Sequence, residues 1–576
     1  MHIYERTVGG RRYRVLATST RVAGRQHPVS RQVSLGPVED DTPIVPSQCR
    51  EVGFRRVGDV GALLEVADDL GVLEAFDAVA PRTGEGPSLG EMILAVALQR
   101  VCEPAGKTHL PGFLADCIPR LSVVAPAKVT GQAFHRVTRK VEEAVYQRVQ
   151  IAIAARACEL YRLKTDVLAF DTTNFDTFLA TPTPSKLAQR GHAKSKRADL
   201  RLVGLALMTS STGSVPLFHR TYAGNESDKT VLTGALSALA QLHCELGGKD
   251  RTLVRDGGFA GEQLELAIGE SGYHSVTVLP LSNIAAKEAL AAAVGHLRRL
   301  PGKLHDIKAH RSRYAPDAED RTLVVIESPE LLAGQLRGMK AALLKARKEL
   351  RRIQRRLEQQ RAGTARGKRH TLASLNKRVA QLTDHEHLHE ILHIVVGGSE
   401  AAPTLTFALD RPIWRRLIRE RLGKRVLVTD QNEWTTSRIV RAFRSQWRVE
   451  RAFRRMKRGA VSPWGPSYQW TDDSMRAHTF ATVLGLQLAT LVRLRLRRAG
   501  LRLSVRAALR KLAEIRLTRL LTHSGGMGGP RTIHVPPRLD AQGNACVRLF
   551  ALDRWTSLIS ATLQKRSRPR PERSAR

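Results

Sequence analysis

DVLAF (166–170), LRLVGLALMTS (200–210) and SVPLFHRTYAG (214–224) are the segments that decide the fold of this chain. Each is short, rich in Val, Leu or Phe, and followed by polar or Gly residues, which is typical of β-strands. The next segment, DKTVLTGALSALAQLHCEL (228–246), has apolar residues three and four apart and predicts a helix. Three strands followed by a helix indicate a sheet that is covered by helices.

The following segments extend this pattern. TLVRD (252–256), GEQLELAIGES (261–271) and HSVTVLPL (274–281) predict a strand, a helix and a strand. This order of elements is expected of a mixed α/β sheet of the ribonuclease H type. We therefore predict an α/β fold with a ribonuclease H-like core.

A heptad pattern interrupts this core. From 331 to 390, apolar residues recur at alternating spacings of four and three, and Lys and Arg fill most other positions. RAGTARGKRH (361–370) divides the pattern, which predicts an antiparallel helical hairpin with a basic exterior. Such a hairpin could be a structural arm or a DNA clamp. KRVLVTD (424–430) then predicts a further strand.

The amino-terminal and carboxy-terminal parts of the chain show other sequence patterns. Residues 1 to about 40 alternate polar with apolar side chains and predict a small β ribbon, whereas about 55 to 160 show helical spacing. GQAFHRVTRKVEEAV (131–145) could be a recognition helix or an ordinary packed helix. The predicted parts are a ribbon or arm (1–48), an α-helical DNA-binding domain (49–160), the first part of the core (161–285), an insertion (286–425) that contains the hairpin (331–390), the second part of the core (426–475), a C-terminal helical region (476–562) and a disordered basic tail (563–576).

The charge of the chain points to a polyanionic partner. There are 93 Lys and Arg residues against 54 acids, a formal net charge of +39. A charge of this size repels itself unless a polyanion or counterions are present, so nucleic acid is the first candidate partner.

Other features bear on the compartment. No run of 18 apolar residues predicts a membrane span, and the start MHIYERTVGGRRYRV lacks the apolar segment of a signal peptide. The six cysteines are dispersed without a CxxC spacing, so we expect neither disulfides nor a zinc finger. The sequence predicts a cytoplasmic protein without a membrane partner.

Residues 441–458 carry eight Lys or Arg residues and a single acid, Glu450. The stretch lacks Gly and Pro, which predicts that Phe443, Glu450 and Lys457 lie on one face of one helix. A carboxylate among cations suits a site that holds Mg²⁺ against a nucleic-acid backbone. The alternative is a solvated basic helix in which Glu450 pairs with a neighbour such as Arg454.

Two aspartates are candidates to join Glu450. Asp171 follows the strand DVLAF, and Asp256 ends the strand TLVR before two glycines. Both would emerge at strand ends, where α/β sheets place ligands. Three carboxylates are the hard oxygen ligands expected for one or two Mg²⁺ ions at a phosphodiester. Asp166 and Asp176 are rival acids, which we rank below Asp171.

One motif favours another class of enzyme. His389, Glu390 and His393 form HEILH, in which two histidines on adjacent helical turns could bind Zn²⁺ as in metalloproteases. No third ligand stands at a recognised spacing, and the run IVVGG follows at once. We therefore interpret these histidines as residues at the end of the hairpin.

The chain resembles the DDE transposases of bacterial insertion sequences. The motifs that carry the resemblance are FDTTNFDTF (170–178), GHAKSKRADL (191–200), VRDGGFAG (254–261) and FRSQWRVERAFRRMKRG (443–459). The last is similar to the tyrosine, arginine, glutamate, lysine signature helix of the insertion-sequence-four superfamily. The resemblance implies a ribonuclease H-like core with an insertion between the second and third acids.

The resemblance also implies the site residues. Asp171, Asp256 and Glu450 would be the catalytic and metal-binding acids. Phe443 stands in the place of the tyrosine and Gln446 in the place of the arginine. The expected DNA contacts are Lys457, Arg448, Arg444, Arg454, Phe443, His192 and Lys194; the last two lie in a basic linker that could instead be a solvated loop.

The implied reaction is cut-and-paste DNA transposition. Water would attack the phosphodiester at a transposon end, and the freed 3′ hydroxyl would attack target DNA. The implied cofactor is Mg²⁺, for which Mn²⁺ can substitute, and the implied partners are double-stranded DNA, as transposon ends and target, and a second copy of the chain in a homodimer. The alternatives are a catalytically inactive DNA-binding relative and a DNA nuclease of the same fold.

Overall fold

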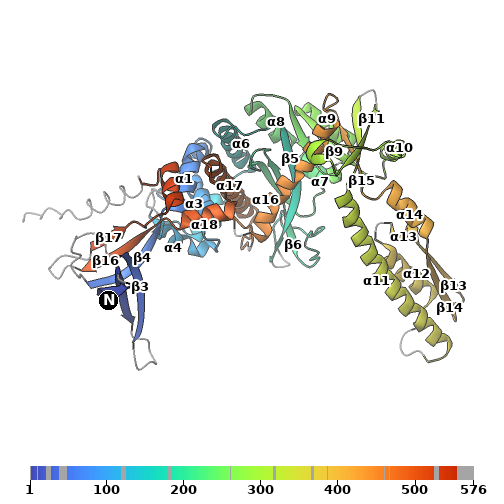
Figure 1. Cartoon of the computed structure of the whole chain (residues 1–576), viewed down its shortest axis with the longest axis horizontal. Helices are drawn as coiled ribbons and strands as arrows, with labels where there is room; N and C mark the ends of the chain where they lie inside the picture. Colours follow the sequence, from blue (N-terminus) through green and yellow to red (C-terminus); the bar gives the residue numbers. More distant parts are fainter. Residues whose placement is uncertain are drawn as a thin grey trace, which may run out of the picture. The chain divides into compact units, whose positions relative to one another are not determined.

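The computed structural model of the chain divides into two compact units. Met1–Lys249 and Trp447–Arg576 form the first unit, and Asp250–Gln446 forms the second (Figure 1). The predicted basic tail, 563–576, lies outside the described residues. The described residues are 2–9, 11–20, 28–37, 48–82, 84–117, 125–179, 183–259, 261–315, 320–364, 369–385, 387–459, 461–465, 467–523 and 531–553.

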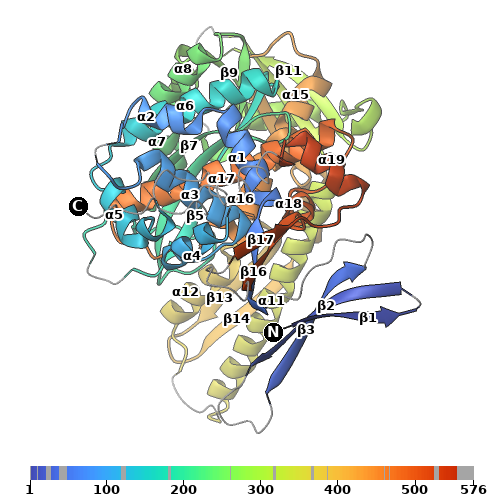
Figure 2. The ribbon, with the colours of Figure 1, turned by 90° about the vertical axis from the view of Figure 1, so that its left-hand side faces the viewer.

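The chain begins with an antiparallel sheet in the first unit. β1 (His2–Val8), β2 (Arg11–Thr20) and β3 (Val29–Pro37) pair in that order (Figure 2). Their alternating polar and apolar residues predicted this ribbon, and the pairing confirms it.

A group of helices follows around a long central helix. α17 (Asp472–Arg498) contacts α1, α3 and the later helix α18 (Val505–Ala513). α17 is long and apolar enough to cross a membrane, but 89% of its most apolar window is buried inside the protein. Packing among helices therefore accounts for its composition. The surrounding helices are α1 (Gly58–Asp69), α2 (Val72–Asp77), α3 (Leu89–Cys102), α4 (Leu110–Ala115), α5 (Gly131–Thr138) and α6 (Glu143–Leu160).

The prediction that 476–562 is helical is wrong for the segment that follows α18, because two strands form there. β16 (Arg516–His523) pairs with β4 (Gln48–Arg56) on one side and with β17 (Arg531–Val535) on the other. Because β4 comes from the other end of the sequence, no local pattern could indicate this pairing. Among the described residues after α18, only α19 (Ala541–Leu549) is helical.

The first unit also contains the three strands that open the α/β segment. β5 (Val167–Thr177), β6 (Arg201–Thr209) and β7 (Pro216–Ala223) form an antiparallel arrangement in that order. Two helices follow, α7 (Asp228–Thr233) and α8 (Leu236–Glu245). The predicted order of three strands and a helical segment is confirmed, with the helix broken in two.

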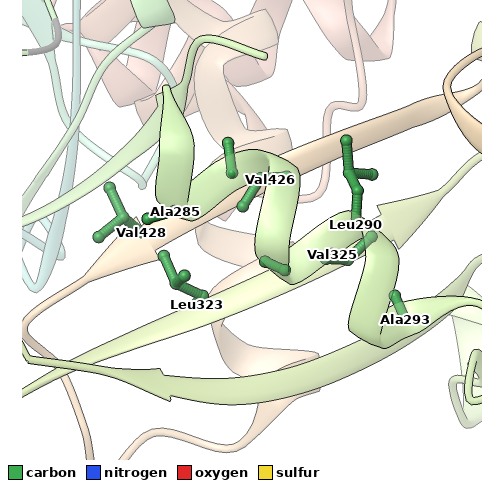
Figure 3. Close-up of a cluster of buried hydrophobic side chains, with 9 residues drawn as sticks. Ala285, Leu290, Ala293, Leu323, Val325, Val426 and Val428 are labelled. Atoms are coloured by element: carbon green, nitrogen blue, oxygen red, sulfur yellow. The ribbon is translucent and has the colours of Figure 1, made fainter. Parts of the chain in front are cut away.

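The second unit contains a mixed set of strands. They lie in the order β10-β11-β12-β15-β9-β8, with β8 and β9 parallel and the other neighbours antiparallel. Ala285, Leu290 and Ala293 of α10 (Ile284–Ala293) pack on Val325 and Val426 of two of these strands (Figure 3). The bounds are β8 (Arg251–Val254), β9 (Tyr273–Leu279), β10 (Arg298–Arg299), β11 (Lys308–Tyr314), β12 (Arg321–Glu327) and β15 (Lys424–Thr429), with α9 (Glu262–Glu270) between β8 and β9.

This arrangement differs from the predicted insertion at 286–425. β10 to β12 belong to the sheet, because they pair in series with β15, and α10 packs on it. The separate arm begins only at α11 (Pro329–Arg361). Alternation in β12 is obscured because five successive residues, 322–326, are buried, so its period did not distinguish it as a strand.

The arm contains more than a helical hairpin. α11 packs with α12 (Leu372–Thr383) through Leu350, Ile353, Leu357 and Leu375, as the heptad pattern predicted. A β-hairpin that the heptad analysis missed also packs here, since Leu405 belongs to the same cluster (Figure 1). Its strands are β13 (Leu392–Gly398) and β14 (Pro403–Leu409), flanked by α13 (Leu388–Ile391) and α14 (Arg411–Glu420).

The single helix predicted through 441–458 is broken. α15 (Thr436–Phe443) ends in a 3₁₀ turn at Arg444–Gln446, and α16 (Trp447–Arg458) begins after it. The buried residue Phe443 and the buried residue Val449 are six positions apart, which does not place them on one stripe of a regular helix. The tighter winding of the 3₁₀ turn changes the phase, so each helix can bury its own apolar face.

Candidate active site

Asp171 lies within a strand and not at its end. β5 continues from the predicted segment through TTNFDT to Thr177, and Asp171 pairs with Leu207 of β6. Threonine and phenylalanine favour extended structure, which explains the longer strand. The prediction that Asp171 follows the strand is therefore wrong, although Asp171 is still only partly buried.

Strand alternation places Asp171 on the same face of β5 as Phe175. The pairing of β5 with β6 is regular from 169 to 177, so residues two and four apart share a face. The Phe175 ring stacks on Trp464 at 4.7 Å between ring centres, and the Lys457 ammonium group lies 5.7 Å from the Phe175 ring centre. Asp171 therefore faces the side of the sheet on which Lys457 lies.

α16 presents Glu450 and Lys457 on one flank. The helix packs on β5 and β6 through residues that include Val449, Phe453 and Met456, which are buried. Glu450 and Lys457 are exposed and seven residues apart, which places them within about 20° of each other around the helix. This part of the one-face prediction holds, whereas Phe443 belongs to α15.

Two contacts show how α16 runs along β5. The carboxylate of Asp166, just before β5, interacts electrostatically with Arg448 near the start of the helix. Lys457, near the other end of the helix, contacts Phe175. The order of these two pairs indicates that the helix runs in the same direction as the strand, with Glu450 between Arg448 and Lys457 along the helix.

A second acid lies near Asp171 that sequence analysis missed. Asp228 Oδ1 accepts a hydrogen bond from Thr172 Oγ1 at 2.5 Å. Burial raises the pKa of Tyr222, and the charges of Asp228 and Asp171 both contribute to the rise. Ser227 is the residue that caps α7, by accepting from the Thr230 N–H, which leaves the Asp228 carboxylate for Thr172.

The basic linker is attached to β5. Lys194 Nζ donates to the Thr172 carbonyl oxygen at 2.5 Å, and the Lys194 N–H donates to Asn174 Oδ1 at 3.2 Å. Asn174 Nδ2 in turn donates to the His192 carbonyl oxygen at 2.9 Å. His192 and Lys194 are thus held along the strand that carries Asp171. Of the rival acids, Asp176 accepts from Ser195 Oγ at 2.8 Å.

Asp256 is in the second unit, two residues after β8. Its side chain is exposed, and Oδ1 accepts from the Gly257 N–H at 2.8 Å. The preceding residue, Arg255, is fully buried, donates to the Phe259 carbonyl oxygen at 2.9 Å and forms an ion pair with Glu265. These contacts fix the turn that presents Asp256. The buried Arg255 and Glu265 pair was not apparent from the sequence.

The remaining predicted contacts differ in exposure. Arg444 and Arg454 are exposed, and burial lowers the pKa of the partly buried Arg448. Phe443 is buried in the second unit, where the Arg425 guanidinium lies 5.7 Å from its ring centre. Its side chain therefore packs in α15 and is not presented beside Glu450.

The HEILH motif does not have zincin geometry. His389 is in the one-turn helix α13, whereas His393 is in β13. Glu390 accepts from His387 Nδ1 at 2.6 Å and pairs with Arg421 at 3.3 Å. The two histidines are therefore not on adjacent turns of one helix, and the metalloprotease alternative has no support from this motif.

Carboxylate oxygens are the donors that a divalent cation such as Mg²⁺ prefers, and Asp171 and Glu450 lie on two elements that pack together. Among the described residues, no group of three or more His, Cys, Asp or Glu side chains is placed to hold a metal ion. The donor chemistry of the acids fits the cation. Asp228 binds the hydroxyl of Thr172, whose side chain lies on the opposite face of β5 from Asp171, so Asp171 and Glu450 are the candidate ligands in the first unit.

Comparison with known proteins identifies the family. A family model described as a transposase DDE domain matches residues 162–461, more than half of the chain. No curated protein matches the chain. A piggyBac transposase synaptic complex with hairpin DNA, solved by cryo-electron microscopy, is similar with a TM-score of 0.37 and 10% identity, over 81% of this chain and 82% of that chain. The chain belongs to the family of transposases with a DDE domain.

Proposed function

We propose that this transposase cleaves DNA at the ends of its own mobile element and joins the cut ends to target DNA. The observation that carries the proposal is the packing of α16 on β5, with Glu450 and Lys457 on one flank of the helix and Asp171 on the strand face toward Lys457. The carboxylates of Glu450 and Asp171, together with the positive charge of Lys457, suit a reaction at a phosphodiester. The finer proposal is a member of the insertion-sequence-four superfamily with a ribonuclease H-like core.

Asp171, Asp256 and Glu450 are the proposed catalytic acids. Their oxygens would hold Mg²⁺, which supplies a Lewis acid that activates water and stabilises the leaving oxygen of the phosphodiester. DDE transposase domains generally use divalent metal ions. In the first unit, Asp171 is positioned by its pairing with Leu207, and Glu450 by the buried face of α16.

The cations would hold the DNA backbone in place. Lys457 is fixed against Phe175, and Lys194 is fixed against the Thr172 carbonyl oxygen, so both have defined positions along β5. Positively charged side chains bind phosphate oxygens with charge-assisted hydrogen bonds. Arg444, Arg448 and Arg454 would add to this binding. The route would be cut-and-paste, with water as the first nucleophile and the 3′ hydroxyl as the second.

The test uses a labelled duplex that carries the inverted repeat flanking the gene, incubated with Mg²⁺. We expect the natural protein to cleave the labelled strand, and Glu450→Gln to lose cleavage while it still binds the duplex. Glu159→Gln is the matched control, because Glu159 is an exposed residue on α6 whose ion pair with Arg156 is on the surface. Chelation of divalent cations should also abolish cleavage.

Three results would contradict parts of the proposal. Equal cleavage by Glu450→Gln and the natural protein would remove Glu450 from the site. Binding without cleavage by the natural protein would indicate an inactive DNA-binding relative. Cleavage without joining of the cut end to a second duplex would indicate a nuclease.

A further inference from the structure

A second basic site lies in the first unit, and its lining residues differ from the candidate site residues described above. It is an open pocket of about 810 Å³, a size that accommodates a nucleotide-sized ligand. Its walls come from the end of α3, the start of α5 and α17. The residues that matter below are Arg100, Lys107, His135, Tyr468, Gln469 and His478.

Arg100 brings a positive charge that the pocket does not neutralise. Its side chain is buried, and it donates to the carbonyl oxygens of Pro463 at 2.8 Å, Gly465 at 3.1 Å and Ala105 at 3.3 Å. Burial lowers the pKa of Arg100 to about 10, so the guanidinium is charged at neutral pH. None of the pocket-lining residues that the structure describes is acidic.

Lys107 is a second basic residue in the lining of the pocket, and two contacts fix the position of its amine. Its Nζ lies 3.1 Å from His478 Nδ1 and 4.4 Å from the centre of the Phe134 ring. His478 Nε2 lies 2.8 Å from the Trp464 carbonyl oxygen, which can only accept. His478 Nε2 is therefore the donor in this bond, and Nδ1 of the neutral ring accepts from Lys107.

The protonation of Lys107 depends on its surroundings. Burial, followed by repulsion from Arg100, lowers the pKa of Lys107 to about 7, and burial lowers the pKa values of His478 and His135. The titratable groups that line the pocket are Arg100 on α3, Lys107 and His109 before α4, His135 on α5, Tyr468 before α17 and His478 on α17. A buried positive charge without a neighbouring acid lowers the stability of the fold, and a bound anion would offset this loss.

We infer that this pocket binds a phosphate group of a nucleic-acid strand. The two cations and the absence of acids in its described lining select an anion. Tyr468 in the lining is 66% exposed, and Trp470, two residues further along the chain, is 71% exposed. Such rings are stacking partners for unpaired bases. A phosphate with an adjoining base uses both features, whereas free phosphate uses only the first.

The pocket is connected to the acid-bearing strand. Trp464, whose carbonyl oxygen binds His478, stacks its ring on Phe175, and Phe175 contacts Lys457. This inference rests on the proposed function, because it assigns a second contact to the DNA on which the acids would act. A nucleic-acid strand held in the pocket would therefore lie near the stacked rings of Trp464 and Phe175.

The reactivity of the Lys107 amine tests the site directly. Competitive labelling with acetic anhydride at pH 8, read by mass spectrometry, compares Lys107 with the exposed Lys140 of the same unit. Inorganic phosphate or the end duplex should slow labelling of Lys107 about tenfold, because a bound anion favours the protonated amine, which does not react with the anhydride. Lys140 labelling should stay constant with inorganic phosphate.

Each outcome decides between the possible ligands. Protection by the duplex and by inorganic phosphate supports the inference. Protection by inorganic phosphate alone, in protein that binds the duplex, overturns it in favour of a free-phosphate site. Protection by neither also overturns it.

A variant separates this inference from the proposed function. Lys107→Met should weaken duplex binding about 10-fold while Lys140→Met leaves it unchanged, since the first variant removes a charge-assisted hydrogen bond to phosphate. Unchanged duplex binding by Lys107→Met overturns the inference. If the natural protein binds no DNA, the proposed function fails, and protection by inorganic phosphate together with a single-stranded oligonucleotide still decides whether the pocket accepts a nucleic-acid phosphate.

Discussion

Lys457 of α16 holds its ammonium group 5.7 Å from the centre of the Phe175 ring on β5. A cation over an aromatic face is attracted by the ring, and this contact restricts where a flexible lysine can reach. Phe175 is in turn fixed by its stacking on Trp464. The lysine is therefore positioned before any ligand binds, on the strand face that also carries Asp171.

Replacing Lys457 should reduce cleavage more than it reduces stability. We expect Lys457→Met to lower the cleavage rate about 10- to 100-fold, because a charged hydrogen bond to phosphate contributes about 1.5–3 kcal/mol. The midpoint of urea unfolding should hardly change, since the side chain is exposed. Lys457→Arg, which keeps the charge, should recover part of the rate. A rate equal to that of the natural protein in Lys457→Met would show that this lysine does not act on the DNA.

Thr172 should contribute to stability through Asp228. Thr172→Val keeps the shape of the side chain but removes the hydroxyl that donates to Asp228 Oδ1. We expect a loss of about 1–3 kcal/mol in the free energy of unfolding, as for other hydrogen bonds to a charged and partly buried acceptor. Thr233→Val is the control. Thr233 is on α7, the helix that carries Asp228, and its hydroxyl donates to the exposed backbone carbonyl oxygen of Lys229. Equal losses in both variants would exclude a special role for Thr172.

The buried pair of Arg255 and Glu265 should fix the turn before Asp256. Arg255→Met leaves Glu265 with Ser275 and Arg321 as its remaining partners, and removing one member of a buried pair costs about 3–5 kcal/mol. The double variant Arg255→Met, Glu265→Gln should lose less than the sum of the single losses. Thermal and urea unfolding of the three variants would measure this coupling, and strict additivity would contradict it.

Sequence patterns predicted those parts of the protein whose signals are local. The three strands of the first unit, the amino-terminal ribbon and the heptad contacts of α11 with α12 all follow from periodicity. The pairing of β16 with β4 joins distant segments, and the 3₁₀ turn after Phe443 depends on which faces are buried. Both are set by tertiary packing, which local propensity does not describe.

The candidate site shows the same division. The flank of α16 that Glu450 and Lys457 share could be predicted, because helical spacing is a local property. The roles of Thr172, Asp228 and Phe175 could not, since each depends on a contact between separate elements. Asp171 illustrates the limit: the residue stays a candidate, and the length of the strand that carries it, β5, was predicted too short.

Lys107 should make stability depend on pH. Its pKa is about 7 in the folded protein and near 10.5 in an unfolded chain, so the unfolded state binds more protons between these values. The free energy of unfolding should therefore rise as the pH is raised from about 7 toward 10. Urea unfolding at several pH values should show this rise in the natural protein and a smaller rise in Lys107→Met. Addition of inorganic phosphate should raise stability most near pH 7, where a bound anion favours protonated Lys107. The same slope in both proteins would show that Lys107 retains its ordinary pKa in the fold.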